Sequence, residues 1–167
     1  MPQNMAAEPH RIRVARVDEA QLLSELALRS KAHWGYSPDF FEACRAELSY
    51  SGEQLLSERM RFLVLERAGS VIGFYALRHH HGEPMELEAL FVEPRCIGQG
   101  FGRLLVEHAK SVALDMGASQ LIIQGDPNAE GFYLAAGGVL TGTMESGSIP
   151  GRLLPTFVIN LSEDHAA

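Results

Sequence analysis

A chain of 167 residues, of which 46% are hydrophobic and 21% charged, has the length and balance of one globular domain. These figures exclude a disordered chain, a collagen-like repeat and a disulfide scaffold, and the formal net charge of −7 disfavours binding to nucleic acid. No apolar run approaches the roughly 20 residues that span a bilayer, and we find no signal peptide and no metal or redox cysteine spacing. We therefore expect a cytoplasmic protein that binds neither nucleic acid nor a membrane.

The hydrophobic pattern predicts strands and helices that alternate along the chain. Strands are expected at 11–16, 61–66, 71–77, 85–92, 120–124, 139–144 and 156–161. Helices are expected from 18 to 31, from 38 to 48, from 101 to 116 and from 126 to 136. The first helix begins at a capping box formed by Asp18 and Gln21, with Leu22 in its buried stripe, and Ser37 caps the second. This order predicts one mixed α/β domain at 11–161, with flexible ends at 1–10 and 162–167.

A glycine-rich turn, Arg-Cys-Ile-Gly-Gln-Gly-Phe-Gly at 95–102, follows the strand at 85–92, and a long helix begins at once. Glycines let the backbone approach a ligand, and converging N–H groups at a helix N-terminus favour an anion, in particular a pyrophosphate. Arg95 and Arg103 add positive charge on either side. The chain has no Walker loop, and the Gly-x-Gly-x-Gly spacing in mid-chain disfavours a Rossmann dinucleotide site. A tight turn without a ligand is the alternative.

Two segments together resemble motifs of the GCN5-related N-acetyltransferase (GNAT) superfamily. Residues 92–105, Val-Glu-Pro-Arg-Cys-Ile-Gly-Gln-Gly-Phe-Gly-Arg-Leu-Leu, resemble its acyl-CoA-binding motif, and residues 128–137, Asn-Ala-Glu-Gly-Phe-Tyr-Leu-Ala-Ala-Gly, resemble its Asn-Ala-x-x-Phe-Tyr segment. Two departures are Ile97, where the family usually has Arg or Gln, and Gly138, where it tends to have Phe. The resemblance implies a mixed sheet of six or seven strands flanked by helices, whose central parallel strands, 85–92 and 120–124, splay apart.

The resemblance further implies acetyl-CoA as co-substrate, with no metal. Backbone groups of Leu90 and Val92 would pair with the pantetheine amides, and Asn128 would bind the same arm unless it is an ordinary residue of a helix N-terminus. The implied cofactor-binding residues are Leu90, Phe91, Val92, Arg95, Ile97, Gly98, Gln99, Gly100, Phe101, Gly102, Arg103, Asn128 and Tyr133. The run His79-His-His81 suggests a metal, but no Cys or carboxylate pattern completes a tetrahedral site, so an exposed hairpin tip is preferred.

The chemistry requires a base, because an amine with a pKa of about 10 is mostly protonated at neutral pH. Glu86 and Glu88 lie two apart in one strand and therefore nominally share a face. Glu88 is the preferred base, directly or through water, and Glu86 is the second candidate. The alternative is that they pair with Arg61 or Arg78. Tyr133 matches the family's tyrosine beside the CoA sulfur and is expected to act as the acid, with packing against the sheet as its alternative.

The acceptor side is expected at the aromatic loop of His33, Trp34 and Tyr36, with simple packing as the alternative, and the loop at 146–152 is expected to border the same pocket. The expected reaction is acetyl transfer to a primary amine of a small molecule by direct attack. A protein or peptide N-acetyltransferase and a non-catalytic acyl-CoA-binding module are the alternatives, and the charge of −7 disfavours an RNA-acetylating toxin. Family members often form homodimers, but the sequence identifies no interface.

Overall fold

The computed structural model describes residues 9–79 and 84–161, in which seven strands form one sheet of order β1-β2-β3-β4-β5-β7-β6. The strands are β1 (His10–Val14), β2 (Met60–Arg67), β3 (Ser70–Arg78), β4 (Met85–Val92), β5 (Gln120–Gln124), β6 (Val139–Glu145) and β7 (Leu153–Asn160). The helices are α1 (Ala20–Ala32), α2 (Pro38–Cys44), α3 (Gly52–Leu56), α4 (Phe101–Asp115) and α5 (Glu130–Ala135). The mixed α/β fold expected from the sequence is confirmed. His80, His81 and the ends at 1–8 and 162–167 lie outside the described residues.

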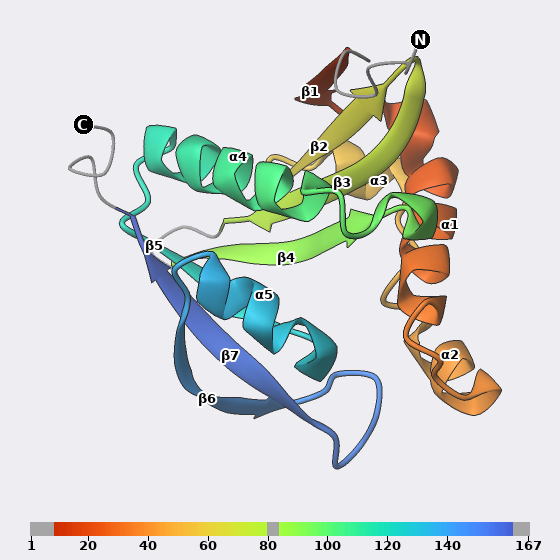
Figure 1. The fold of residues 1–167 in the computed structure, drawn as a ribbon, viewed down its shortest axis with the longest axis vertical. Coiled ribbons are helices and arrows are strands. Elements are labelled where there is room, and N and C mark those ends of the chain that lie inside the picture. The colour runs from red at the N-terminus through yellow and green to blue at the C-terminus, as the bar shows by residue number, and fades with distance from the viewer. Residues whose placement is uncertain (1–8, 80–83, 162–167) are drawn as a thin grey trace, which may run out of the picture.

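Helices cover both faces of the sheet (Figure 1). Leu63 and Leu65 of β2 pack in a core cluster with α4 and α5, whereas the alternate residues Phe62 and Val64 pack in a second cluster with α1 and α2. Alternation of side chains along an extended strand explains why one apolar run serves both clusters. The sheet is therefore buried on both sides at its centre, as its nearly continuous hydrophobic strands indicate.

The start of α1 differs from the prediction. The backbone N–H of Arg16 donates to Glu19 Oε1 at 2.7 Å, so Glu19 rather than Gln21 provides the acceptor, and a short 3₁₀ turn at Val17–Glu19 precedes the helix. Arg13 holds the Glu19 carboxylate through two contacts of 2.9 Å, which a local motif does not reveal. Leu22, expected in the buried stripe, is 41% exposed.

Other element boundaries follow from local capping. Ser37 Oγ accepts the N–H of Phe40 at the start of α2, which confirms the predicted cap. Helix α3 was not predicted, although Ser51 and Gln54 form a reciprocal capping box there. A five-residue helix is too short to show hydrophobic periodicity. Strand β1 begins at His10, one residue before the predicted boundary.

The parallel strands β4 and β5 pair over three residue pairs only, from Met85–Leu121 to Leu87–Ile123. Beyond this point they diverge (Figure 1), while β4 stays paired to β3 as far as Val92. The edge of β4 that faces β5 is therefore open from residue 88 to 92. The β3–β4 register also shifts here, so that Glu88 is an extra residue in a bulge.

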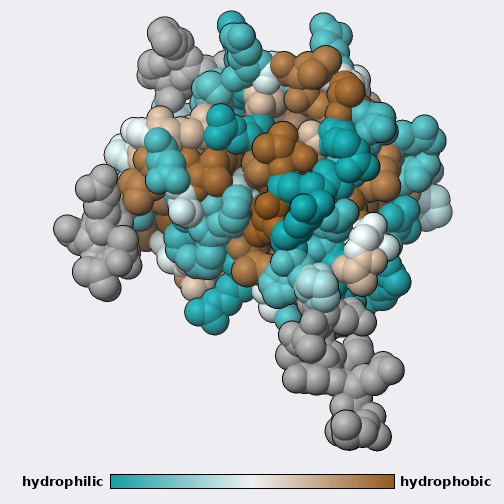
Figure 2. All heavy atoms as spheres, turned by 90° about the horizontal axis from the view of Figure 1, so that it is seen from above, coloured by the Kyte–Doolittle hydropathy of each residue, from teal (hydrophilic) through white to brown (hydrophobic). Residues whose placement is uncertain are grey.

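On the face seen from above in Figure 2, hydrophilic side chains surround separate apolar patches. Among the described residues, the most exposed large apolar side chains are Leu56 and Val14, at 72% and 67%. None of the helices within residues 9–79 and 84–161 is long and apolar enough to cross a membrane.

Candidate active site

A cavity of about 820 Å³ extends from the glycine turn past the open edge of β4 to the residues that follow α2. Many predicted site residues contribute to its wall: Trp34, Glu86, Glu88, Leu90, Phe91, Val92, Ile97, Gly98, Gly100, Gly102, Arg103, Asn128 and Tyr133. Five others do not contribute: His33, Tyr36, Arg95, Gln99 and Phe101. One continuous space therefore joins the predicted anion site to the predicted base and acid.

The glycine turn presents unpaired donors at one end of the cavity. Gly98 and Gly100 have φ values of +86° and +88°, which an L side chain would strain. The N–H groups of residues 98–103 donate to no acceptor in the described parts of the chain, and α4 begins at Phe101. Gly102 lies against Phe132, whose ring would be 3.2 Å from an added Cβ. The turn can therefore bind an anion through its backbone.

Three side chains of this turn point elsewhere. The amide of Gln99 donates to the carbonyl of Arg95 at 3.2 Å, and the guanidinium of Arg67 lies 5.1 Å from the ring centroid of Phe101. Arg95 is exposed and does not line the cavity, so its predicted contact with the co-substrate stays a prediction. Arg103, in the first turn of α4, does line the cavity.

Glu88 forms an ion pair with Arg78, with 2.6 Å between Oε1 and Nη2. This pair was the predicted alternative to the base role of Glu88, and it is present in the structure. The second carboxylate oxygen, Oε2, has no hydrogen-bond partner within residues 9–79 and 84–161, and the side chain is 31% exposed. Glu86 lies opposite Arg78 in the β3–β4 register and also lines the cavity. One oxygen of Glu88 is therefore available to a ligand.

Tyr133 is 8% exposed, with its ring between Phe132 and Phe157. Burial raises the pKa of its phenol above the usual value, and the charge of Asp126 adds to the effect. The phenol is thus protonated at neutral pH, and its hydroxyl hydrogen-bonds no group in the described chain. It can donate to a ligand in the cavity.

The departure from the family pattern at Gly138 has a structural reason. The N–H of Gly138 donates to the carbonyl of Tyr133 at 2.9 Å, and that of Gly137 donates to Leu134 at 3.1 Å. These bonds close the C-terminus of α5. An added Cβ at Gly138 would lie 2.8 Å from the Tyr133 carbonyl oxygen, so glycine is required by this backbone.

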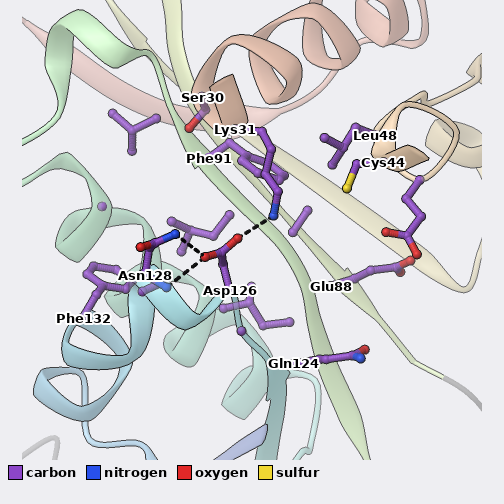
Figure 3. Close-up of a pocket in the computed structure, with 18 of the residues that line it drawn as sticks. Ser30, Lys31, Cys44, Leu48, Glu88, Phe91, Gln124, Asp126, Asn128 and Phe132 are labelled. Atoms are coloured by element: carbon purple, nitrogen blue, oxygen red, sulfur yellow. Dashed lines mark hydrogen bonds and ion pairs between the residues drawn. The ribbon is translucent and has the colours of Figure 1, made fainter. Parts of the chain in front are cut away.

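Asp126, two residues after β5, connects several elements around the cavity. Its carboxylate accepts hydrogen bonds from Lys31 at 2.6 Å and from the backbone N–H of Asn128 at 2.8 Å (Figure 3). It also accepts a hydrogen bond from the Tyr36 hydroxyl at 2.7 Å. Burial alone would raise the pKa of Asp126, but these bonds outweigh it and lower the pKa to about 2. Asp126 was not predicted, because nothing in the local sequence separates it from an ordinary helix cap.

Asn128 and Tyr36 belong to the same network. The Asn128 amide nitrogen donates to the Tyr36 hydroxyl at 2.8 Å and to Asp126 at 3.0 Å. Its carbonyl oxygen has no partner among the described residues. Burial and the hydrogen bond to Asp126 raise the pKa of Tyr36 to about 12. Tyr36 therefore hydrogen-bonds Asn128 and does not itself line the cavity. Trp34, which is 45% exposed, does line it.

Tyr50 and Glu47 also line the cavity and were not predicted as site residues. The Tyr50 ring packs edge-on against Phe62 and Phe74, and its backbone N–H donates to Ser24 Oγ. Burial raises the pKa of Tyr50, and the nearby carboxylates of Glu88 and Glu47 raise it further. The far end of the cavity is therefore acidic and holds a protonated phenol.

An open pair of parallel strands, a glycine turn at a helix N-terminus and one cavity between them define the class of acyl-CoA-dependent acyltransferases. In agreement, the profile of the Acetyltransferase (GNAT) family matches residues 26–137. The chain belongs to this family and is an acetyl-CoA-dependent acyltransferase, as its motifs indicated.

Two relatives and two solved structures illustrate the similarity. The chain is 32% identical over 135 residues to the peptidyl-lysine N-acetyltransferase YjaB of Salmonella typhimurium and 31% identical to YjaB of Escherichia coli, covering 80% of this chain in each case and 86% and 85% of the relatives. The fold is similar to PaiA N-acetyltransferase of Thermoplasma acidophilum in complex with coenzyme A (TM-score 0.74, 22% identity, 91% of this chain and 99% of that one). It also resembles spermidine/spermine N-acetyltransferase SpeG of Vibrio cholerae (TM-score 0.68, 18% identity, 94% and 95% covered).

Proposed function

We propose that this protein transfers the acetyl group of acetyl-CoA to a primary amine by direct attack. The observation that carries the proposal is the single cavity that joins the unpaired N–H groups of the glycine turn to Glu88 and Tyr133. A binding module without activity would not need a carboxylate oxygen and a phenol that both lack partners in that cavity.

Residues at the C-terminal end of β4, in the turn that follows it and after β5 fit the co-substrate. The N–H groups of residues 98–103, at the N-terminus of α4, would bind the pyrophosphate, with Arg103 beside them. The open edge of β4 at Leu90 and Val92 would pair with the pantetheine amides as a neighbouring strand would. The free carbonyl oxygen of Asn128 would accept a hydrogen bond from the same arm. Acetyl-CoA, when bound, supplies the thioester carbonyl that the amine attacks.

Glu88 and Tyr133 would share the proton transfers. Oε2 of Glu88, directly or through a water, takes the proton that the attacking nitrogen loses as the N–C bond forms. Arg78 keeps the other oxygen in place. The Tyr133 hydroxyl donates a hydrogen bond to the sulfur as the C–S bond breaks and the thiolate leaves. Glu86 is the second candidate for the base.

The acceptor class has two candidates. The small-molecule amine expected from the sequence is supported by the acidic end of the cavity, where Glu47 and Glu88 would attract an ammonium group. The peptidyl-lysine alternative is supported by the names of the two relatives that are 31% and 32% identical. A lysine side chain would present the same ammonium group to the same residues.

Calorimetric titration with acetyl-CoA, with NAD as control ligand, tests the first step. Binding of acetyl-CoA alone is expected, and a folded protein that binds neither refutes the proposed function. Turnover is then measured with free amines and with lysine peptides in competition, which separates the two acceptor classes.

Tyr133→Phe tests the acid. We expect kcat to fall about 10²-fold, at the low end for acid–base groups, with acetyl-CoA affinity retained. Tyr75→Phe is the matched control, because the Tyr75 hydroxyl bonds His108 Nδ1 at 2.7 Å and Tyr75 does not line the cavity. Equal losses of kcat in both variants would contradict the role of Tyr133.

A further inference from the structure

Arg152, in the loop between β6 and β7, is held against the cavity by groups from distant parts of the chain. Its Nη2 donates to the Tyr36 hydroxyl at 3.1 Å and to Asp126 at 3.4 Å. Its guanidinium lies 4.5 Å from the ring centroid of Phe40 and 5.4 Å from that of Tyr36. The two rings stack on each other at 4.0 Å, so they form a firm support. The guanidinium is therefore fixed in place before any ligand arrives.

Most of the hydrogen-bonding capacity of Arg152 is unused. Nε and Nη1 donate to no acceptor in the described parts of the chain. The side chain is 17% exposed and lines the cavity. Among the described residues, Nε of Arg13 is the fully buried polar side-chain atom that lacks a hydrogen-bond partner. The free donors of Arg152 are absent from that class, so they are not fully buried and reach open space. These donors can meet an acceptor that enters the cavity.

The charge of Arg152 is also poorly balanced. Asp126 is the carboxylate beside it, but Lys31 Nζ already lies 2.6 Å from the same Asp126 oxygen that Arg152 approaches at 3.4 Å. Two cations thus share one anion, and all three side chains are between 14% and 17% exposed. A half-buried positive charge without a full counter-charge favours an anionic partner.

The co-substrate does not provide this anion. The charged groups of acetyl-CoA are phosphates, which the proposed function places at residues 98–103, whereas its pantetheine and acetyl parts are neutral. The cavity wall also carries Glu47 and Glu88, which suit an ammonium group. Resting on the proposed function, we propose that Arg152 binds a carboxylate of the acceptor, so that the preferred acceptors are amines that also carry a carboxylate, such as amino acids.

The test compares acceptors that differ only in this charge. Amino acids and ω-amino carboxylates, each paired with its carboxamide, are assayed with acetyl-CoA for kcat/KM in wild type, Arg152→Gln and Arg152→Lys. Arg45→Gln is the matched control, because Arg45 also lies over an aromatic ring, that of Phe41 at 5.9 Å, but does not line the cavity. Acetyl-CoA binding is followed separately by calorimetry.

In wild type and Arg45→Gln, we expect kcat/KM for the carboxylate to exceed that for the carboxamide about 10-fold or more, as for a hydrogen bond to a charged group. Arg152→Gln should bring this ratio close to one, and Arg152→Lys should restore part of it. A wild-type ratio of one or below, turnover of lysine peptides without turnover of any carboxylate-bearing amine, or an unchanged ratio in Arg152→Gln overturns the proposal. Failure of acetyl-CoA to bind would instead refute the proposed function.

Discussion

The Asp126 network makes the stability of the fold depend on one carboxylate. Its pKa falls from the usual 3.8 to about 2, and at about 1.4 kcal/mol per pKa unit this gives about 2 kcal/mol. Asp126→Asn should therefore lower the free energy of unfolding by about 2 kcal/mol at pH 7. The side chain is 16% exposed, so solvent screening removes little of this value.

The pH dependence follows from the direction of the pKa change. Because the folded-state pKa lies below the unfolded one, the stabilisation is complete above about pH 4 and is lost as the pH falls toward 2. About half of the difference between wild type and Asp126→Asn should remain at pH 3.

Urea denaturation at pH 7, 4 and 3 measures this difference. The control is Asp115→Asn at the exposed end of α4, which should change the unfolding free energy by no more than about 0.5 kcal/mol. If the unfolding free energies of wild type and Asp126→Asn differ by the same amount at pH 7 and pH 3, the electrostatic explanation is refuted.

Three further perturbations test other parts of the structure. Glu88→Gln should lower kcat about 10²–10⁴-fold at fixed pH, measured by initial rates, while full activity across pH would exclude it as the base. Gly138→Ala should destabilise the fold by about 1–3 kcal/mol, because its Cβ would lie 2.8 Å from the Tyr133 carbonyl oxygen; thermal unfolding compares it with Gly131→Ala, which has open space. Glu19→Gln should lower the free energy of unfolding by about 3 kcal/mol at pH 7, because the pKa of Glu19 is lowered from 4.5 to about 2. In urea denaturation this loss should shrink as the pH falls below about 4.5.

The parts of the fold that local chemistry determines were predictable from the sequence. The strand at 85–92 and the glycine turn after it were predicted because a buried apolar run, Pro94 and closely spaced glycines mark their limits. The strand at 120–124 was predicted from its apolar centre, whereas its place beside the strand at 85–92 in an open parallel pair was implied by the resemblance to the GNAT superfamily.

The site residues that sequence reasoning missed depend on contacts between distant segments. Tyr36 and Asp126 are 90 residues apart, and Tyr36 and Arg152 are 116 apart, so no local pattern indicates their hydrogen bonds. The bulge at Glu88 could not be predicted either, because a register shift between β4 and β3 is not visible in the sequence of β4 alone. Tyr36 was predicted to lie on the acceptor side, but in the structure it supports Asn128 and Arg152 and does not line the cavity.

The short pairing between β4 and β5 has a consequence for how the molecule opens. Because only the pairs from Met85–Leu121 to Leu87–Ile123 continue the sheet across this point, β5, β7 and β6 share few backbone hydrogen bonds with β1 to β4. Amide exchange should therefore divide the sheet into two cooperative units, with the β5–β7–β6 unit opening at lower free energy. A ligand that pairs with the open edge of β4 and also contacts the residues after β5 would join these two units. With the substrate bound, the two units would therefore open together as one cooperative unit.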